Sequence, residues 1–244
     1  MQQYENQYND WHQSVHGNRS GCLIDLKQWH YDALSLASEV QGSLVLEIGC
    51  GVGDFAFELE NRGCVVNAVD FSATAIQIAG KKGLDRASKV VFKCADACLL
   101  PFSDNCFDNI FCCECLEHLP DPATAIKEMA RVLKPGGALI LTTENYSNAL
   151  ILMWLKCLLL RQPFNSGGTT QPLERFFLFP MIYRMFSRAG LKITATRAAH
   201  HVFLLWPRTH PHRFVVERFS NPFLRWLFKP FGRHWTYCAV KRSL

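Results

Sequence analysis

Three glycines at alternating positions, Gly49, Gly51 and Gly53, follow directly after an apolar run that begins at Leu44. This spacing predicts a tight turn whose backbone lies open to a ligand, because glycine has no Cβ and adopts positive φ without strain. Asp70 ends a second apolar run, 17 residues after Gly53. A carboxylate at that distance accepts hydrogen bonds from both hydroxyls of a ribose. The chemistry indicated is the recognition of a nucleoside.

A second group with chemical potential is Glu114-x-x-Glu117-His118. On a helical turn, positions i, i+3 and i+4 share one face, so two carboxylates and one imidazole would converge. Such a set would bind a divalent ion such as Mg²⁺. Two other interpretations stay open: His118 is a general base or substrate contact, or the group is structural. His200 and His201 are candidates for a fourth ligand by reach alone.

The elements that must position these residues follow from the hydrophobic pattern and its breakers. The pattern predicts a buried strand before the glycines, a helix after them, and alternating strands and helices as far as residue 143. Ser72 is a suitable N-cap for the helix that begins at Ala73. Strands are expected over 44–48, 65–70, 90–95, 109–113, 138–143, 190–196 and 234–242, and helices over 28–40, 54–62, 73–80, 123–133, 148–161 and 180–189.

An acidic residue (Glu47) before Gly-x-Gly-x-Gly and a carboxylate (Asp70) after the second strand resemble the class I S-adenosylmethionine-dependent methyltransferases, of the methyltransferase type 11 kind. The Glu-x-x-Glu-His pattern occurs in ubiquinone-biosynthesis O-methyltransferases and in small-RNA 2′-O-methyltransferases, where it binds a metal. The resemblance covers residues 40–145. Nicotinamide or flavin binding is the alternative, but it would favour Gly or Ala where Asp54 stands.

The resemblance implies an α/β, Rossmann-like fold with a seven-stranded, mostly parallel sheet of order 3-2-1-4-5-7-6. Strand seven would be antiparallel, and helices would cover both faces. We expect a single methyltransferase domain over 1–244. It would comprise an N-terminal lid and helix (1–40), a cofactor-binding core (41–147), and a substrate cap with the last strands (148–244). A frayed terminus is the alternative to a lid.

The same resemblance assigns the site. Asp70 would hold the ribose and Asp96 the adenine amino group. S-adenosyl-L-methionine is the implied cofactor, with Mg²⁺ if the metal interpretation holds, and Glu114, Glu117 and His118 would face the acceptor as the catalytic residues. The full set of predicted cofactor residues is Glu47, Gly49, Cys50, Gly51, Gly53, Asp70, Phe71, Ser72, Asp96, Ala97 and Cys113.

Charge is distributed unevenly along the chain. Residues 161–244 contain 14 Lys and Arg against 2 Asp and Glu, whereas residues 1–160 contain 12 against 19. This basic third favours a substrate cap that meets an acceptor, with contact to an anionic membrane surface or to nucleic acid as alternatives. We expect O-methylation of a small-molecule or lipid-like acceptor. The alternatives are methylation of an RNA ribose and a non-catalytic cofactor-binding module.

The cysteines and the N-terminus bear on the compartment. The chain has eleven cysteines, several within predicted strands, and residues 1–21 are polar. We interpret the thiols as reduced, small buried hydrophobic groups. No cleavable leader is expected, so the predicted location is cytoplasmic, with membrane association tied to the basic third.

Overall fold

The computed structural model describes residues 2–16, 24–37, 40–144, 175, 177–202, 215–216, 221, 223–224 and 232–242. The strands are β1 (Leu44–Ile48), β2 (Val65–Asp70), β3 (Val91–Cys94), β4 (Phe107–Cys113), β5 (Leu133–Glu144), β6 (Leu191–Val202), β7 (Val215–Val216) and β8 (Gly232–Lys241). The helices are α1 (Gln2–His16), α2 (Gln28–Leu36), α3 (Asp54–Asn61), α4 (Ala73–Asp85), α5 (Pro122–Val132) and α7 (Phe179–Arg188), with a 3₁₀ turn η1 (Leu116–His118).

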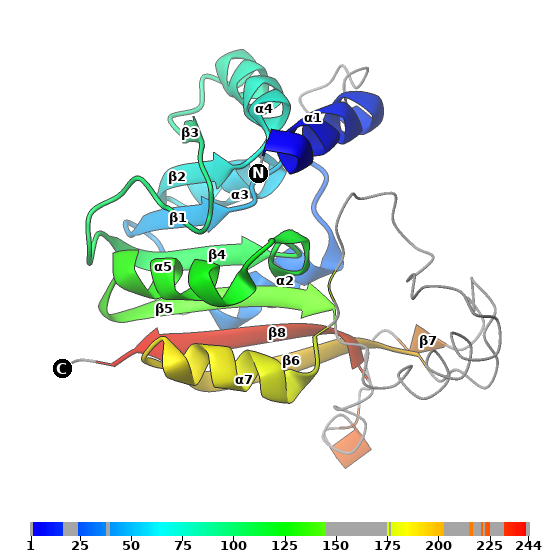
Figure 1. Cartoon of the computed structure of the whole chain (residues 1–244), viewed down its shortest axis with the longest axis vertical. Helices are drawn as coiled ribbons and strands as arrows, with labels where there is room; N and C mark the ends of the chain where they lie inside the picture. Colours follow the sequence, from blue (N-terminus) through cyan, green and yellow to red (C-terminus); the bar gives the residue numbers. More distant parts are fainter. Residues whose placement is uncertain are drawn as a thin grey trace.

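The strands form one sheet of order β3-β2-β1-β4-β5-β8-β6-β7, seen edge to edge in Figure 1. β1 pairs parallel with β2 and with β4, whereas β8 pairs antiparallel with both β5 and β6. The predicted order 3-2-1-4-5-7-6 is therefore confirmed, with β8 as the predicted seventh strand. The difference is β7, a two-residue addition that pairs with the end of β6.

Helices cover both faces of the sheet, each over its own apolar cluster. On one face α5 lies in front of β4 and β5 and α7 in front of β8 and β6, and Ile126, Met129 and Phe186 are fully buried there. On the other face α2 and α3 bury Ala33 and Phe55 against β1 and β4. Because both faces are covered, the parallel strands read as continuous apolar runs in the sequence.

Several boundaries differ from the sequence-based expectation: the helix expected over 28–40 ends at Leu36, and the strand expected over 190–196 extends to Val202. β5 begins at Leu133, which pairs with Phe107 before a register shift, so the Pro-Gly-Gly predicted to end the preceding helix lies within the strand. Helix α4 continues through Gly80 to Asp85, because nothing in its packing stops it there. The apolar helix predicted over 148–161 lies outside the described residues.

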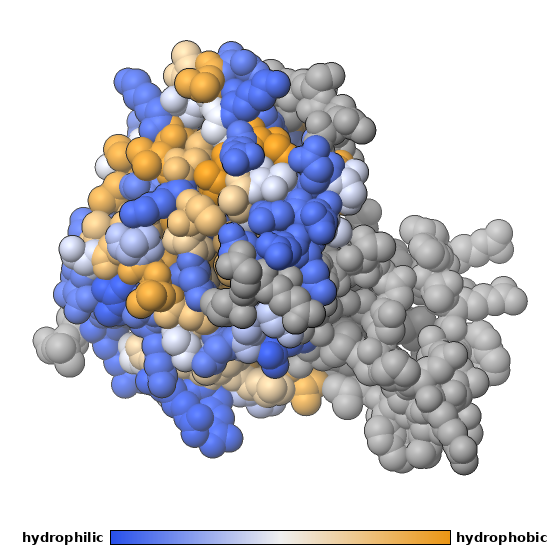
Figure 2. Space-filling view, turned by 45° about the horizontal axis from the view of Figure 1, so that its top comes forward, coloured by the Kyte–Doolittle hydropathy of each residue, from blue (hydrophilic) through white to orange (hydrophobic). Residues whose placement is uncertain are grey.

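Several large apolar side chains are exposed on the described surface. In the described part of the chain, the large hydrophobic residues that are most exposed include Leu84, Leu99 and Phe223. On the face of the molecule drawn in Figure 2, hydrophobic residues gather on the side away from the grey residues, and hydrophilic residues lie between them. No helix among the described residues is both long enough and apolar enough to cross a membrane.

Candidate functional site

A cavity lies at the carboxyl ends of β1 to β4. Here β2 and β3 are added to one side of β1, whereas β4 and β5 are added to the other side. Open α/β sheets bind ligands at such a switch point, because the loops on its two sides diverge. The lining residues come from strand ends, from the turn after β4 and from α1. They are Tyr4, Tyr8, Trp11, His12, His16, Ile48, Gly49, Gly51, Val52, Val69, Asp70, Phe71, Ala95, Asp96, Ala97, Glu114, Cys115, His118, Leu119 and Pro120.

The glycine turn forms the floor of this cavity. Gly49 has φ +73°, and a Cβ at this position would lie 2.5 Å from the Sγ of Cys115. Gly53 has φ +85° at the N-cap of α3, and a Cβ there would lie 2.8 Å from the ring of Phe92. Both positions therefore require glycine for the backbone angle and for the close approach of a neighbour. The adjacent Asp54 forms an ion pair with Lys82 of α4.

Asp70 is held rigidly at the end of β2. Its Oδ2 accepts a hydrogen bond from the Gly51 amide at 2.8 Å, and its Oδ1 accepts one from the Ser72 amide at 2.8 Å. Each carboxylate oxygen has further acceptor capacity, and the residue lines the cavity. Two acceptors fixed side by side at a strand end have a geometry that suits the vicinal hydroxyls of a ribose, so the predicted role of Asp70 stays a prediction that this geometry allows.

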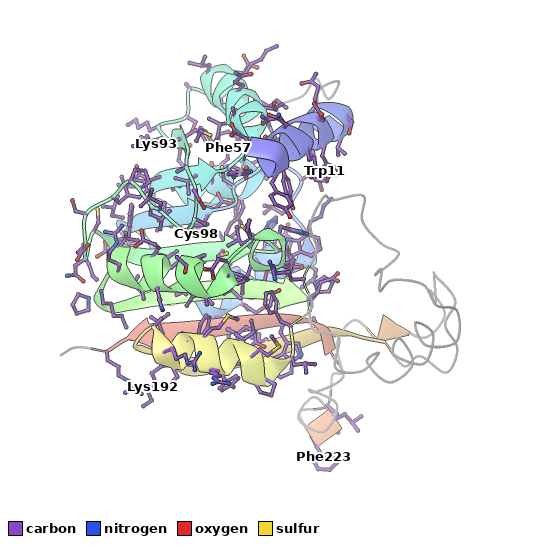
Figure 3. All side chains as sticks on the ribbon, in the orientation of Figure 1. Trp11, Phe57, Lys93, Cys98, Lys192 and Phe223 are labelled. Carbon is purple, nitrogen blue, oxygen red and sulfur yellow. The ribbon has the colours of Figure 1, made fainter. Side chains whose placement is uncertain are left out.

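The other predicted cofactor residues fall into two groups. Asp96 and Ala97 line the cavity after β3, in the loop that also contains Cys98 (Figure 3), and the Asp96 carboxylate accepts a hydrogen bond from the Cys98 amide at 2.8 Å. Phe71 lines the cavity as well. Ser72 is buried and caps α4, as predicted, by accepting a hydrogen bond from the Ala75 amide.

Of the predicted cofactor residues, Glu47, Cys50 and Cys113 are buried next to the cavity and, like Gly53 and Ser72, are not part of its lining. Cys50 and Cys113 belong to the apolar cluster beneath α2 and α3, where burial raises the pKa of both thiols well above its ordinary value. Glu47 lies in β1 with 3% of its surface exposed. Burial and the negative charge of Asp70 raise the pKa of Glu47 to about 8. Its Oε2 has no hydrogen-bond partner among the described residues, which leaves an acceptor for a ligand.

The turn after β4 differs from the predicted helical arrangement. Glu114 has φ +47°, and the 3₁₀ turn begins only at Leu116. Glu114 and His118 line the cavity, but Glu117 is 3% exposed and accepts a hydrogen bond from the Thr143 hydroxyl at 2.9 Å. Glu117 Oε1 lies 3.9 Å from His118 Nε2, but Glu114 precedes the helical turn instead of starting it. Among the described residues, the predicted metal set of Glu114, Glu117 and His118 therefore does not bring its ligand atoms within 4.8 Å of one another.

The two carboxylates of this turn have opposite electrostatic surroundings. Burial alone would raise the pKa of Glu114, but the His234 imidazole, 3.4 Å away, together with Thr142 and His118, holds this pKa below its usual range. Burial, together with the charge of Glu114, raises the pKa of Glu117 well above its ordinary value. The surroundings of this turn therefore favour the ionised form of Glu114 and the protonated form of Glu117.

Arg175 fixes the position of this turn from a distant part of the sequence. Its backbone amide donates to the Glu117 carbonyl at 2.8 Å, and its guanidinium donates to the carbonyls of Leu119 and Pro120 at 2.9 and 2.7 Å. His118 lies between the anchored carbonyls. Arg175, which precedes α7, thus holds the turn after β4 in place.

The residues that sequence reasoning missed are mainly on α1. Figures 1 and 3 show this helix beside α4, at the carboxyl ends of the strands, with Trp11 on it. The signal was present: Tyr4, Tyr8, His12 and His16 recur every four residues, which is helical spacing for one face. All four line the cavity.

Asn9 joins α1 to the ribose side of the site. Its side-chain oxygen accepts hydrogen bonds from the Ser72 hydroxyl at 2.7 Å and from the Thr74 amide at 3.1 Å.

We expect Asn9→Ala to weaken the binding of S-adenosylhomocysteine by about 10-fold, because hydrogen bonds of about 1 kcal/mol each would no longer hold α1 in place. Isothermal titration calorimetry measures this change. Gln7→Ala, at an exposed position of the same helix, is the matched control; equal affinity in both variants would contradict the role of Asn9.

Comparison with known proteins identifies the central region. Residues 46–141 match a family model described as a methyltransferase domain. The ubiquinone biosynthesis O-methyltransferase of Alkalilimnicola ehrlichii is 38% identical over 107 residues, which are 43% of this chain and 43% of that protein. The chain thus matches less than half the length of this curated relative.

Solved structures extend the likeness to the whole chain. A putative methyltransferase in complex with the Haloferax volcanii Trm112 methyltransferase activator has a TM-score of 0.66 at 19% identity, covering 99% of this chain and 98% of that one. The [4+2]-cyclase SpnF has a TM-score of 0.65 at 20% identity, covering 100% and 96%. Identities this low show a shared fold, and a methyltransferase and a [4+2]-cyclase both have this fold.

Proposed function

We propose that the chain is a class I S-adenosylmethionine-dependent methyltransferase that transfers a methyl group to an oxygen of a small-molecule or lipid-like acceptor; the match of residues 46–141 to a methyltransferase domain supports this. The observation that supports this proposal most directly is one shared cavity. Asp70, suited to a ribose, and His118, suited to proton transfer, both line it.

The residues present fit the cofactor. Asp70 would hold the ribose hydroxyls, and Asp96 with the Ala97 amide would hold the adenine. Glu47, with its unpartnered buried oxygen, would face the cationic methionine end. The cofactor supplies a methyl group already activated by the positive sulfur. The chain itself contributes mainly by holding nucleophile and methyl group in line, which is worth roughly 7–11 kcal/mol of the barrier.

An oxygen acceptor agrees with an imidazole in the cavity. An acceptor hydroxyl is protonated when it binds, so methyl transfer to its oxygen needs a base that can remove the proton. His118 lies beside the cavity, in the turn that Arg175 holds in place. The relative with 38% identity is named an O-methyltransferase. Because Glu114, Glu117 and His118 do not converge, the proposal routes no step through Mg²⁺.

We expect His118→Ala to lower kcat by about 10²–10⁴-fold, which is the usual contribution of a general base. The affinity for S-adenosylhomocysteine should stay within about twofold. Added imidazole should restore part of the activity, since a free base can enter the space left by the side chain. Steady-state kinetics with a panel of phenolic, polyprenyl and ribose hydroxyls measures the effect; unchanged kcat, or no rescue, would refute the base assignment.

The second candidate is methylation of an RNA ribose, favoured by the excess of basic residues in 161–244. It predicts binding to single-stranded RNA that weakens steeply with salt, because released counterions drive such binding. A filter-binding assay from 50 to 200 mM salt tests it, and co-sedimentation with anionic vesicles tests the lipid-like acceptor. If cofactor binds and no acceptor reacts, an activator protein, such as the one in the Haloferax volcanii complex, is the next component to add.

A further inference from the structure

Three potential metal ligands meet at the ends of three strands beside the cavity. Glu114 follows β4, Glu144 is the last residue of β5, and His234 lies in β8 directly opposite Glu144 in the antiparallel register. The imidazole Nδ1 of His234 lies 3.4 Å from a Glu114 oxygen, and its Nε2 lies 3.9 Å from a Glu144 oxygen. One ligand atom from each of the three lies within 4.8 Å of the others.

The group is shielded from water and held in place. The exposed fractions of the side chains of Glu114, Glu144 and His234 are 14%, 11% and 13%. The His234 ring stacks on Trp29 of α2, with centroids 5.4 Å apart and an angle of 20° between the rings. The Glu114 amide donates to both the carbonyl and the hydroxyl of Thr142, which fixes the left-handed turn that aims its side chain.

Glu114 supplies the independent indication of a ligand. Its Oε1 is buried and has no hydrogen-bond partner among the described residues. A buried polar atom without a partner costs free energy unless something else satisfies it. A second carboxylate, Glu144, lies within the same small volume, so a bound cation would both satisfy the oxygen and balance the two negative charges.

We propose that Glu114, Glu144 and His234 bind a divalent cation with mixed oxygen and nitrogen preference, such as Mn²⁺ or Zn²⁺. Two carboxylates and one imidazole suit these ions, whereas Mg²⁺ prefers oxygen ligands alone. The cation would lie at the wall of the cavity, since Glu114 lines it. This site shares Glu114 with the set predicted from the sequence and differs in its other two ligands. It does not depend on the proposed methyl transfer, because binding is measured without any acceptor.

The test uses the full chain after chelation, titrated with Mn²⁺ and followed by the electron paramagnetic resonance signal of the free ion. We expect one equivalent to bind with a Kd below about 100 μM. Glu144→Gln and His234→Gln should each weaken binding at least 100-fold, because losing a ligand costs no less than losing one of its supporting contacts. The matched controls Glu117→Gln and His118→Gln, from the alternative ligand set, should change the Kd by less than threefold.

A measurement on the unmodified chain covers the case in which a variant does not fold. Electron spin echo modulation of the Mn²⁺ complex should show one directly coordinated imidazole nitrogen, and thermal stability should rise with Mn²⁺ concentration. Absence of saturable binding below 1 mM, or a spectrum without nitrogen coupling, would overturn the proposal and leave the three residues as an ion-pair cluster. Loss of binding in the Glu117 and His118 variants alone would overturn it in favour of the predicted set.

Discussion

Replacing Asp70 by alanine should weaken the binding of S-adenosylhomocysteine by about 10²–10⁴-fold. Two hydrogen bonds from the ribose to a carboxylate are worth about 1.5–3 kcal/mol each, and their sum gives this range. The carboxylate is already oriented by the amides of Gly51 and Ser72, so little is lost in fixing it when the ligand binds. Isothermal titration calorimetry on the cofactor-free chain measures the affinity directly.

The variant also removes the acceptor of two backbone amides, so a loss of affinity by itself would not prove contact with the ribose. A cycle with a second ligand separates the two effects. In the unmodified chain, the 2′,3′-dideoxy analogue of S-adenosylhomocysteine should bind far more weakly than the parent compound. In Asp70→Ala the two ligands should bind alike. If the analogue remains equally disfavoured in the variant, the ribose contacts another group and the assignment of Asp70 fails.

There is a physical reason why the sequence alone could place Asp70 at a strand end and the glycines in a tight turn. Both features are local: the positive φ of Gly49 and the position of Asp70 at a strand end follow from a few adjacent residues. Parallel strands then bring their carboxyl ends to one edge, so consecutive motifs become neighbours without further information. The strand order followed from the family resemblance, and the structure confirms it.

The arrangement around Glu114 could not be predicted in the same way. The i, i+3, i+4 rule holds only within a helix, and Glu114 lies in a left-handed turn before one. Its contact with His234 depends on the register of β8 against β5, which is set by residues about 90 positions apart in the sequence. Arg175 is a similar case, because its three hydrogen bonds to the turn after β4 cross more than 50 residues.

Glu47→Gln should make the cofactor-free chain more stable, and the gain should grow with pH. The pKa of Glu47 is about 8 in the folded chain, above its ordinary value of 4.5. Between these two values the folded state binds more protons than the unfolded state, so the contribution of Glu47 to stability falls as pH rises. The glutamine of the variant is neutral at every pH, so it makes no such pH-dependent contribution. The two chains should have similar free energies of unfolding near pH 4.5, and the variant should be more stable by about 4–5 kcal/mol above pH 8.

Urea unfolding at pH 5, 7 and 8.5 without cofactor measures this difference, and a gap that does not change with pH would contradict the buried, protonated state of Glu47. The same variant should bind S-adenosylhomocysteine about 10–100-fold more weakly, since an amide cannot replace a charged acceptor for the ammonium group. The two effects have opposite signs. Glu47 is buried, lowers the stability of the folded chain, and has an oxygen without a partner among the described residues. We attribute its presence to cofactor binding, because residues that bind ligands often reduce stability.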